Sequence, residues 1–390
     1  MNEEIFLDFA RRFMSLPTAS FHEHFAAQAV EAFVAERPEI TCSSDPCGNL
    51  LLLYNGCPSP SPRRPYLIAT AHLDHPGLAY SASVSKSEFA FEMLGGFKLD
   101  LALGSQVSIF HLDSPAEQTP VRGKVTAYRP PQGRRPPALI IAVPPPAASQ
   151  IGPGSFAMWD LPPFKKKGRL LTGRACDDLA GVAVGLTFLH ELVRLREPVR
   201  AGLLLTRAEE IGFGGMLAAV RGKSLKARNI YINIECSSLK AGASLGAGPV
   251  IRLGDRWSVF DPHIAGGMVA IAEDLKAKRA DFKFQRKLMD GGICEATVLM
   301  NAGLQTGAVA LPLKNYHNSG KKRFKPEAVH LDDALGLVDL LIHMATIPGG
   351  LTTAQRAAAR DLDKEMSKRH RKSAARLTRS AQKNEVEIVR

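Results

Sequence analysis

The chain has 390 residues, of which 45% are hydrophobic and 23% are charged, so it is long enough to bury a full core and more than one domain. No apolar run reaches the ~20 residues of a membrane-spanning helix, and the acidic, amphipathic amino-terminal segment is unlike a secretory signal. We therefore expect a soluble cytoplasmic protein without a membrane partner.

The six cysteines form neither a CxxC pair nor a dense disulfide framework, which is typical of reduced thiols in a cytosol. Cys176, Cys236 and Cys294 each adjoin a candidate active-site residue described below. Thiolates are good zinc ligands, but the preferred interpretation of these three is as small, buried hydrophobic side chains.

The net charge of +12 is concentrated at the carboxyl-terminal end. Residues 351–390 hold eleven Lys/Arg and five Asp/Glu, so they supply +6, half of the total. We interpret this segment as a basic tail, helical or flexible and loosely attached. Clustered Lys and Arg can bind nucleic-acid phosphates, but a solvated helix or an assembly contact is the preferred interpretation.

The first half of the chain begins with helical periodicity over residues 3–14 and 22–36, which predicts two amphipathic helices. The apolar run 66–71 predicts a buried strand that ends at His72. Between 78 and 168 short strand patterns alternate with turns, and this segment is expected to form a small β-barrel or sandwich inserted into an α/β domain. The expected strands before and within it cover 50–54, 80–84, 88–93, 106–112, 123–128 and 138–143.

From residue 170 the pattern returns to α/β, and Asp178 is a candidate N-cap for an apolar helix that ends near Leu195. The predicted fold is a mixed, twisted sheet flanked by helices, formed by residues 1–77 and 169–350, with 78–168 as the inserted β domain. The remaining predictions are strands at 201–207, 229–234 and 306–311 and helices at 214–221, 263–279, 293–302 and 326–347.

Ionisable residues recur at or just beyond the ends of the apolar strands, and one lies in the turn before a helix. In open α/β sheets, ligands bind at the carboxyl ends of strands. Unpaired buried acids are costly, so a cluster of them needs cations to hold it together. The residues concerned are His72, Asp177, Glu209, Glu210, Glu235 and His317.

Two histidines with Asp and Glu form a ligand set suited to zinc or cobalt, with manganese less favoured. Two ions about 3.5–4 Å apart can each take one His and one terminal carboxylate, and can share a bridging carboxylate and a water. In this scheme Asp177 is the bridge. His72 and Glu235 hold one ion, and Glu210 and His317 hold the other.

Two further carboxylates have roles in this scheme. Glu209 is left without a metal and is the candidate general base toward the bridging water. Adjacent strand residues face opposite sides of a sheet, so Glu209 and Glu210 reach one site only if the backbone turns, which Gly212 permits. Asp74 follows His72 closely and can accept the second N–H of its imidazole, which fixes the tautomer.

These segments resemble the di-zinc tetrahedral (TET), glutamyl and deblocking aminopeptidases, within the wider clan of co-catalytic di-zinc exopeptidases. The resemblance extends to about residue 347 and includes the inserted β domain. The segments that carry it, in order and with similar spacing, are His72–Asp74, Ala175–Asp178, Glu209–Gly212, Gly248–Ile251 and Pro312–His317.

The resemblance implies a metal-dependent exopeptidase, in the first place an aminopeptidase that removes N-terminal residues from peptides. It implies two divalent ions, zinc before cobalt or manganese, with Glu209 as the base. It also implies a cis-like link between Asp177 and Asp178 and a homo-oligomer in which the β domain takes part. A free α-amine of the substrate would bind a metal ion or a nearby acid such as Glu295.

Several residues depart from the family pattern. Leu179 stands where Arg usually follows the Asp pair, Glu235 replaces an Asp ligand, and Glu295 is one methylene longer than the usual Asp. A Glu in the Glu235 position also occurs in di-metal carboxypeptidases and N-acyl amino acid deacylases, so hydrolysis of another small amide is an alternative function. A non-catalytic binding protein that uses the basic tail is a further alternative, but the complete ligand set argues against it.

Overall fold

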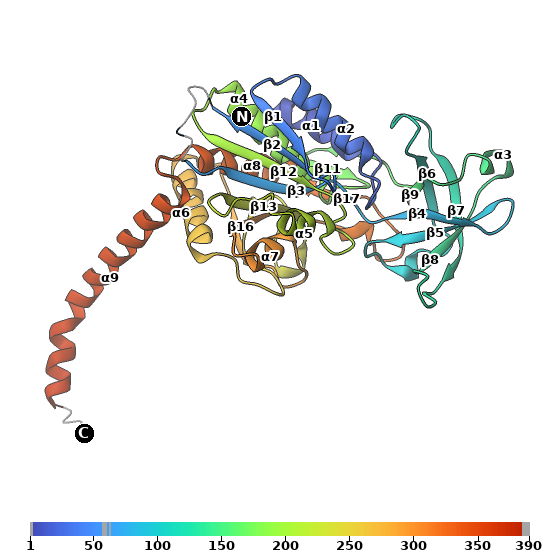
Figure 1. Cartoon of the computed structure of the whole chain (residues 1–390). Helices are drawn as coiled ribbons and strands as arrows, with labels where there is room; N and C mark the ends of the chain where they lie inside the picture. The colour runs from blue at the N-terminus through green and yellow to red at the C-terminus, as the bar shows by residue number, and fades with distance from the viewer. Residues whose placement is uncertain (1–2, 57–60, 62–63, 384–390) are drawn as a thin grey trace.

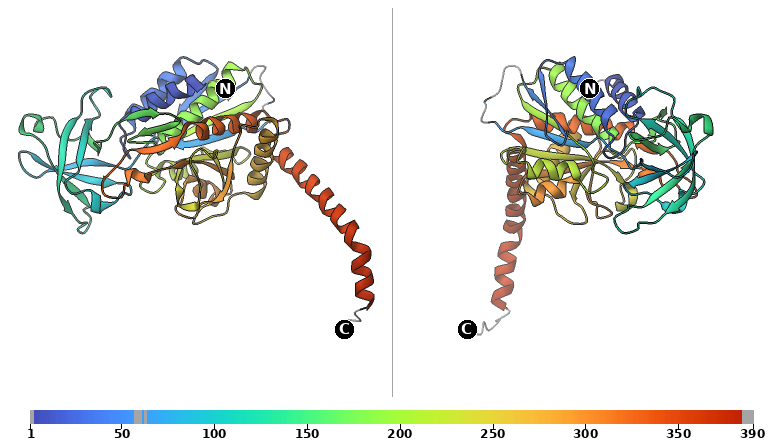
Figure 2. Two further views of the ribbon diagram at one scale, coloured as in Figure 1. Left: turned by 180° about the vertical axis from the view of Figure 1, so that it is seen from behind. Right: turned by 45° about the vertical axis from the view of Figure 1, so that its right-hand side comes forward.

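The computed structural model describes residues 3–56, 61 and 64–383; Cys57 lies outside these ranges. Three parts make up the fold: a mixed sheet covered by helices, a closed barrel, and a long carboxyl-terminal helix (Figure 1). The barrel and the long helix lie at opposite ends of the molecule in every view (Figures 1 and 2).

The central sheet has eight strands, which lie side by side in the order β1 (Ile40–Ser44), β2 (Leu50–Asn55), β12 (Arg200–Thr206), β3 (Leu67–His72), β13 (Ile230–Ser238), β16 (Gln305–Leu313), β14 (Val250–Gly254) and β15 (Gln285–Leu288). The four middle strands, from β12 to β16, run parallel. Their carboxyl ends therefore meet at one edge of the sheet, where α/β proteins bind ligands. β2 and β14 pair antiparallel with these middle strands, so the predicted mixed sheet is confirmed.

Both faces of the sheet are covered, and alternate residues of each strand face opposite layers. Leu67, Ala69 and Leu203 belong to the main core, whereas Ile68 and Leu204 pack in a smaller core on the other face. This double burial explains why the middle strands are apolar without alternation. Helices of the main core are α1 (Glu3–Ser15), α2 (His24–Ala35), α4 (Leu179–Arg194), α6 (Pro262–Lys278) and α8 (Leu331–Thr346); α5 (Gly214–Arg221) and α7 (Glu295–Asn301) cover the other face.

The barrel consists of six antiparallel strands, β4 (Gly77–Ser83), β5 (Glu88–Leu94), β6 (Gln106–His111), β7 (Val121–Arg129), β8 (Ala138–Ala142) and β9 (Ser155–Trp159). Phe91, Val125 and Ile141 are buried in its interior. The predicted barrel is confirmed, although its last strand, β9, was not expected. The segment also contains the one-turn helix α3 (Pro145–Ala148) and the 3-10 turn η1 (Leu99–Leu101).

A separate three-stranded sheet is formed by β10 (Phe164–Lys167), β11 (Leu170–Gly173) and β17 (Glu327–His330). The predicted helix over 326–347 is wrong at its start, because residues 327–330 pair antiparallel with β11 and the helix α8 begins only at Leu331. A long-range strand pairing has overridden the local helical pattern there.

Helix α9 (Gly350–Lys383) leaves the body of the protein. Its first turns are anchored by Leu351 and Ala354, which are buried in the main core, and the remainder projects outward (Figures 1 and 2). In the part of the chain that the structure describes, no individual helix is long and apolar enough to cross a membrane, while the bent pair 331–346 and 350–380 meets that length and composition criterion only when taken together.

Candidate metal centre

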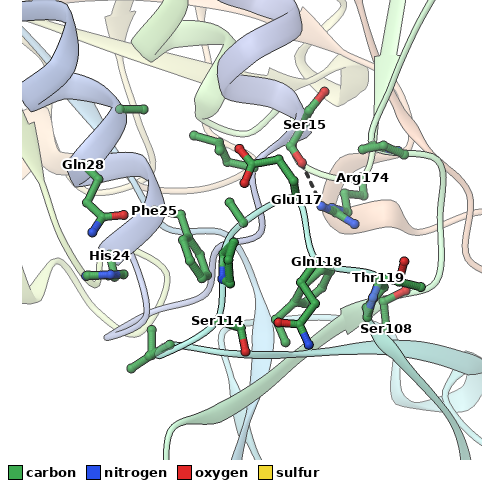
Figure 3. Close-up of a pocket in the computed structure, with 18 of the residues that line it drawn as sticks. Ser15, His24, Phe25, Gln28, Ser108, Ser114, Glu117, Gln118, Thr119 and Arg174 are labelled. Carbon is green, nitrogen blue, oxygen red and sulfur yellow. Dashed lines mark hydrogen bonds between the residues drawn. The ribbon is translucent and has the colours of Figure 1, made fainter.

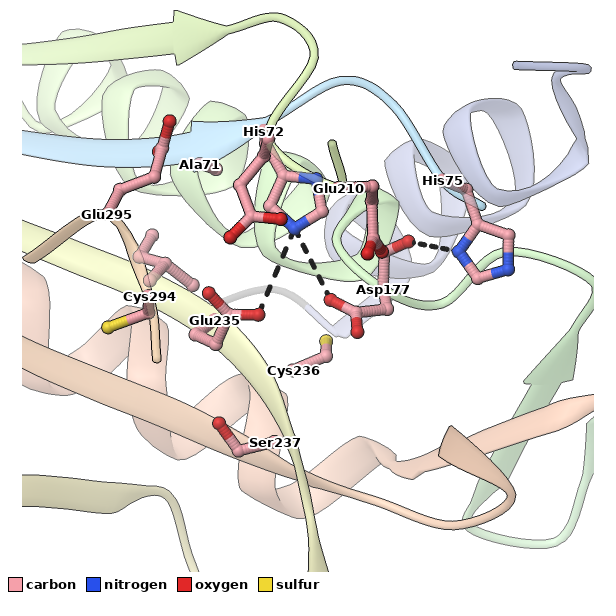
Figure 4. A network of polar contacts seen from close by, with 12 residues as sticks. Ala71, His72, His75, Asp177, Glu210, Glu235, Cys236, Ser237, Cys294 and Glu295 are labelled. Atoms are coloured by element: carbon pink, nitrogen blue, oxygen red, sulfur yellow. Dashed lines mark hydrogen bonds and ion pairs between the residues drawn. The ribbon is translucent and has the colours of Figure 1, made fainter. Parts of the chain in front are cut away.

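The predicted ligands converge at the shared carboxyl edge of the parallel strands, and Figure 4 shows His72, Asp177, Glu210 and Glu235 there. His72 is the last residue of β3, Glu210 follows β12, and Glu235 lies on β13. His317 comes from the turn after β16, and Asp177 from the connection between β11 and α4. Residues more than two hundred positions apart in the sequence thus lie within contact of one another.

One detail of the predicted positions is wrong. The sequence predicts Glu235 at or just beyond the end of its strand, but β13 continues to Ser238 because its backbone pairs with β16 along its whole length. After β12, by contrast, the chain turns as expected: Ala208 and Gly212 have positive φ values of 51° and 108°. Gly215 is required in this turn, since a Cβ there would lie 2.5 Å from the carbonyl oxygen of Arg207.

The two oxygens of Asp177 face different histidines. Oδ1 lies 3.4 Å from His72 Nε2, and Oδ2 lies 3.8 Å from His317 Nε2. Glu235 Oε1 is 3.9 Å from the same His72 nitrogen, and Glu210 Oε2 is 3.2 Å from that of His317. Two three-residue groups therefore share Asp177, and the potential ligand atoms of each group lie within 4.8 Å of one another.

The donor atoms in these groups fit divalent cations. All five side chains are buried or nearly so. Each offers an atom that has no hydrogen-bond partner among the described residues. Buried polar atoms are normally paired, and carboxylate and imidazole atoms without protein partners suit a metal ion. The unpartnered atoms are His72 Nε2, Asp177 Oδ1, Glu210 Oε1, Glu235 Oε2 and His317 Nε2.

Asp74 lies behind His72 and joins it to the turn after β12. Its Oδ1 lies 3.4 Å from His72 Nδ1, and its two carboxylate oxygens accept the backbone N–H groups of Glu209 and Glu210 at 2.9 and 3.1 Å. Ser20 also donates to Asp74, at 2.6 Å. Burial opposes ionisation, but these hydrogen bonds and His72 together lower the pKa of Asp74.

Glu23 is a supporting residue that was not expected from the sequence. It is only 1% exposed, and its carboxylate accepts from the backbone N–H of Ala208 and from Arg207 Nε, both at 2.9 Å. These contacts hold the turn that presents Glu209 and Glu210. A Glu at the start of an amphipathic helix gave no signal of this role, because such residues are ordinarily solvated.

His75 and Asn318 support the other side of the centre. His75 Nδ1 lies 2.6 Å from the carbonyl oxygen of Asp177, and its Nε2 lies 3.2 Å from Asn318 Oδ1. Asn318 also donates to the carbonyl of Arg174 at 3.0 Å. His317 and Asn318 have positive φ values of 50° and 56°, so these bonds fix a backbone form that few residues adopt.

Glu327, on β17, orients the backbone of Asp177. Its Oε2 accepts the backbone N–H groups of Cys176 and Asp177 at 2.8 and 3.0 Å. The peptide bond between Asp177 and Asp178 is cis. Asp178 occupies the N-cap position of α4, but the prediction that its side chain caps the helix is wrong, because the buried carboxylate makes no such hydrogen bond.

The three cysteines beside the site, Cys176, Cys236 and Cys294, are fully buried. Burial raises the pKa of each thiol, which favours the neutral form over the metal-binding thiolate. Their environment agrees with the interpretation of small hydrophobic side chains.

Glu209 and Glu295 lie beside the predicted ligands in different surroundings. Burial, with Glu235 and Glu210 close by, raises the pKa of Glu209 well above its usual range. Glu295 is fully buried and accepts a 2.9 Å hydrogen bond from Thr206, and its burial raises its pKa to about 8. In Figure 4 its carboxylate points away from Asp177. This position argues against direct binding of a substrate amine by Glu295.

A small pocket opens beside Glu235. It is lined by Ser237, Arg252, Ile293 and Tyr316, among others, and has a volume of about 70 Å³. Arg252 is only 3% exposed, and its Nη1 donates to Ser237 at 3.2 Å. Among the described residues, its Nε has no hydrogen-bond partner and no carboxylate forms an ion pair with it.

A larger cavity, of about 1320 Å³, lies between α1, α2 and the barrel (Figure 3). Arg174 lines it and donates to the carbonyl of Ser15 at 2.8 Å, while burial and Arg122 lower the pKa of Arg174 to about 10. None of the predicted metal ligands lines this cavity, so it is distinct from the metal centre.

Metal affinity at this centre is expected to rise with pH. Although burial opposes protonation, Glu210 and Asp177 raise the pKa of His317 to about 9, so in metal-free protein a proton occupies this imidazole below pH 9. A cation has to displace that proton, and its apparent dissociation constant should fall about tenfold per pH unit for each imidazolium displaced. Competition with a chromophoric zinc chelator at pH 6, 7 and 8 measures this slope. His317→Ala should lower the slope of log affinity against pH by about one. A metal affinity that does not change with pH would contradict a protonated His317 in the metal-free protein.

Comparison with known sequences agrees with this geometry. A family model described as M42 glutamyl aminopeptidase matches residues 144–340, about half of the chain. The matched segment contains Asp177, Glu210, Glu235 and His317, whereas His72 lies before it. No curated protein matches the chain.

Solved structures share the fold at low sequence identity. An aminopeptidase from the archaeon Desulfurococcus kamchatkensis has a TM-score of 0.72 at 20% identity, covering 89% of this chain and 96% of that one. A TET aminopeptidase from a marine sediment archaeon of the Thaumarchaeota has a TM-score of 0.72 at 18% identity, with coverages of 90% and 99%. The TET1 peptidase of Pyrococcus horikoshii has a TM-score of 0.70 at 21% identity, covering 88% of this chain and 100% of that one. With the fold, the convergent ligands and the sequence match in agreement, the chain belongs to the M42 glutamyl aminopeptidase family of metal-dependent peptidases.

Proposed function

We propose that this protein removes acidic N-terminal residues from peptides at a centre of two divalent cations. His72, Asp177 and Glu235 would hold one cation, and Asp177, Glu210 and His317 the other, with zinc as the first candidate because of its preference for imidazole and carboxylate ligands. The observation that supports this assignment most is the orientation of Asp177, whose two oxygens face His72 and His317 separately.

Two cations bound there would lower the pKa of a shared water and polarise the scissile carbonyl. In this proposal Glu209 takes the proton of the attacking water and passes it to the leaving amine. The raised pKa of Glu209 suits a group that must both accept and release a proton near neutrality. Asp74 contacts both the imidazole of His72 and the backbone N–H of Glu209. It would therefore keep the ligand His72 and the base Glu209 in fixed relative positions.

Arg252 supports a preference for an acidic side chain. A buried guanidinium without a carboxylate partner is costly, and the pocket that it lines opens directly beside Glu235. A glutamyl or aspartyl side chain of the substrate would supply the missing carboxylate, in the two-pronged geometry that Arg favours. Lys240 at the pocket rim adds a second, exposed positive charge. The family description, glutamyl aminopeptidase, agrees with this preference.

The family match favours an aminopeptidase over the carboxypeptidase and deacylase alternatives. A homo-oligomer is also proposed, with the barrel as a self-association domain, because the structurally similar TET1 peptidase of Pyrococcus horikoshii can assemble into a tetrahedron or a large octahedral shell. Light scattering of the purified chain tests this, and a monomer would contradict it. The cytoplasmic location stays a prediction from the cysteine pattern, which fractionation of the producing cells would test.

The experiment that tests the proposed function combines metal analysis with a peptide screen. Elemental mass spectrometry of purified protein should find about two divalent ions per chain, as expected for a co-catalytic site. Asp177→Asn should lose both ions, because it removes the shared ligand, whereas Glu235→Gln should lose mainly one. Free-amine peptides should be cleaved and their N-acetylated counterparts should not. Equal cleavage of blocked peptides would contradict the aminopeptidase assignment and support the deacylase alternative.

A further inference from the structure

The projecting part of α9 carries a dense positive charge that the metal centre does not explain. Residues 366–383 contain seven Lys/Arg and no Asp/Glu, on a segment about 27 Å long at 1.5 Å per residue. Beyond the anchor at Leu351 and Ala354, the side chains of this helix are almost all exposed through residue 380. The charge is therefore presented away from the body of the protein, as Figures 1 and 2 show for the helix.

Among the described side chains, most of these cations have no counter-charge within the protein. Arg369 pairs with Glu365, and Lys364 pairs with Asp361. For the others, no carboxylate partner exists within the part of the helix whose side chains are described. Like charges three or four residues apart destabilise an isolated helix, so a polyanion would relieve this repulsion. The unpaired cations are Lys368, Arg371, Lys372, Arg376 and Arg379.

The distribution of residues around α9 decides between possible partners. Successive residues of an α-helix are rotated by about 100° about the helix axis. The cations between residues 368 and 379 therefore occupy an arc of roughly 160° around α9. The centre of this arc lies about 130° from an apolar stripe formed by the exposed side chains of Leu362, Met366 and Leu377. A helix bound flat on a membrane buries an apolar face rich in Trp, Phe or Leu. The exposed part of α9 offers only Leu362, Met366 and Leu377 for this purpose among its described side chains, spread over about four turns, so it has little apolar area to insert. A second copy of α9 packed against the apolar stripe would leave most of the cations without a counter-charge.

Linear charge density favours a nucleic acid. Six Lys/Arg between residues 368 and 379 give about one positive charge per 3 Å of helix axis, and duplex DNA carries about one negative charge per 1.7 Å. The major groove of B-DNA, about 12 Å wide, admits an α-helix, whereas the major groove of duplex RNA is deep and narrow.

We propose that the projecting part of α9, residues 366–383, binds the phosphate backbone of double-stranded DNA without sequence preference. With five unpaired cations each contacting a phosphate, log K should fall with log salt with a slope of about −4.5. The interaction goes beyond the peptidase activity and does not depend on the metal centre.

Fluorescence anisotropy of a labelled 20-base-pair DNA duplex with the full chain, between 50 and 200 mM salt, tests this proposal. The triple variant Lys368→Ala, Arg371→Ala, Lys372→Ala should weaken binding at least tenfold at 50 mM salt and reduce the magnitude of the salt slope by between two and three. Lys165→Ala, Lys166→Ala, Lys167→Ala is the matched control, since it removes three exposed charges of β10 and should leave binding unchanged. Peptide hydrolysis should be the same in all three proteins.

The proposal would be overturned by no binding to the duplex at 50 mM salt, by an equal loss in the control variant, or by tighter binding to vesicles containing 30% phosphatidylserine than to DNA. Tighter binding to a duplex RNA of the same length would also overturn it, because the argument depends on groove width. Circular dichroism of the triple variant verifies that α9 remains helical, so that a loss of binding reports charge and not unfolding.

Discussion

Glu209→Gln is expected to lower kcat by about a thousandfold while both cations stay bound. General-base groups contribute about 10²–10⁴ in rate, and glutamine keeps the size of the side chain but cannot accept the proton of the attacking water. Glu209 has no place among the proposed ligands, so metal content should be unchanged. Steady-state kinetics with a glutamyl substrate, together with elemental analysis of the same preparation, measures both quantities.

The same substitution at the neighbouring residue provides the control. Glu210→Gln removes a proposed ligand 3.2 Å from His317, so it should lower both metal content and activity. A Glu209→Gln enzyme that keeps more than a tenth of the wild-type kcat would remove Glu209 from the mechanism. If Glu209→Gln instead lost a cation, Glu209 would be a ligand and the base would have to be another residue.

Arg252→Met is expected to change substrate preference without abolishing catalysis. Removing one partner of a buried charge pair costs about 2–5 kcal/mol, so kcat/KM for a glutamyl substrate should fall by roughly a hundredfold or more. For a leucyl substrate the value should stay constant or rise, because the variant no longer leaves a buried guanidinium without a counter-charge. Parallel assays of glutamyl, aspartyl and leucyl substrates measure the change.

Lys240→Met is the matched control, since it removes the same charge from the exposed rim of the same pocket. Exposed charge pairs contribute at most about 1 kcal/mol, so the glutamyl kcat/KM should change less than about tenfold. An Arg252→Met enzyme that still prefers glutamyl over leucyl substrates would refute the acidic pocket. The two-cation centre and the role of Glu209 would stand, because neither depends on the substrate side chain.

The residues that support the site differ in how much signal they carry in the sequence. His72 and Glu210 follow buried apolar strands, and that local pattern is visible in the chain itself. Glu23 and Glu327 gave no such signal, because each acts on backbone N–H groups more than 100 residues away. Asn318 carries a weak sequence signal of its supporting role. Asn is among the few residues that adopt positive φ, and Asn318 directly follows the predicted ligand His317.

The barrel was predictable from local sequence patterns, whereas the start of helix α8 was not. Short strand patterns between turns predict β structure from neighbouring residues alone, so the barrel was anticipated. The local pattern of residues 327–330 continues that of α8 and predicts a helix, and only the pairing with β11 makes them a strand. Pairing partners distant in sequence cannot be inferred from a local period.

By itself, the sequence determined the chemical inventory of this protein: two imidazoles and several carboxylates placed at strand ends, a β domain between the first His and the shared Asp, and a basic extension. These features are set by residue type and local spacing. Only the tertiary structure decided that the oxygens of Asp177 face separate histidines, that Glu295 is sealed behind the site, and that Arg252 lacks a carboxylate partner within the described part of the chain. Orientation and burial depend on contacts between distant segments, and the order of residues along a chain does not specify those contacts.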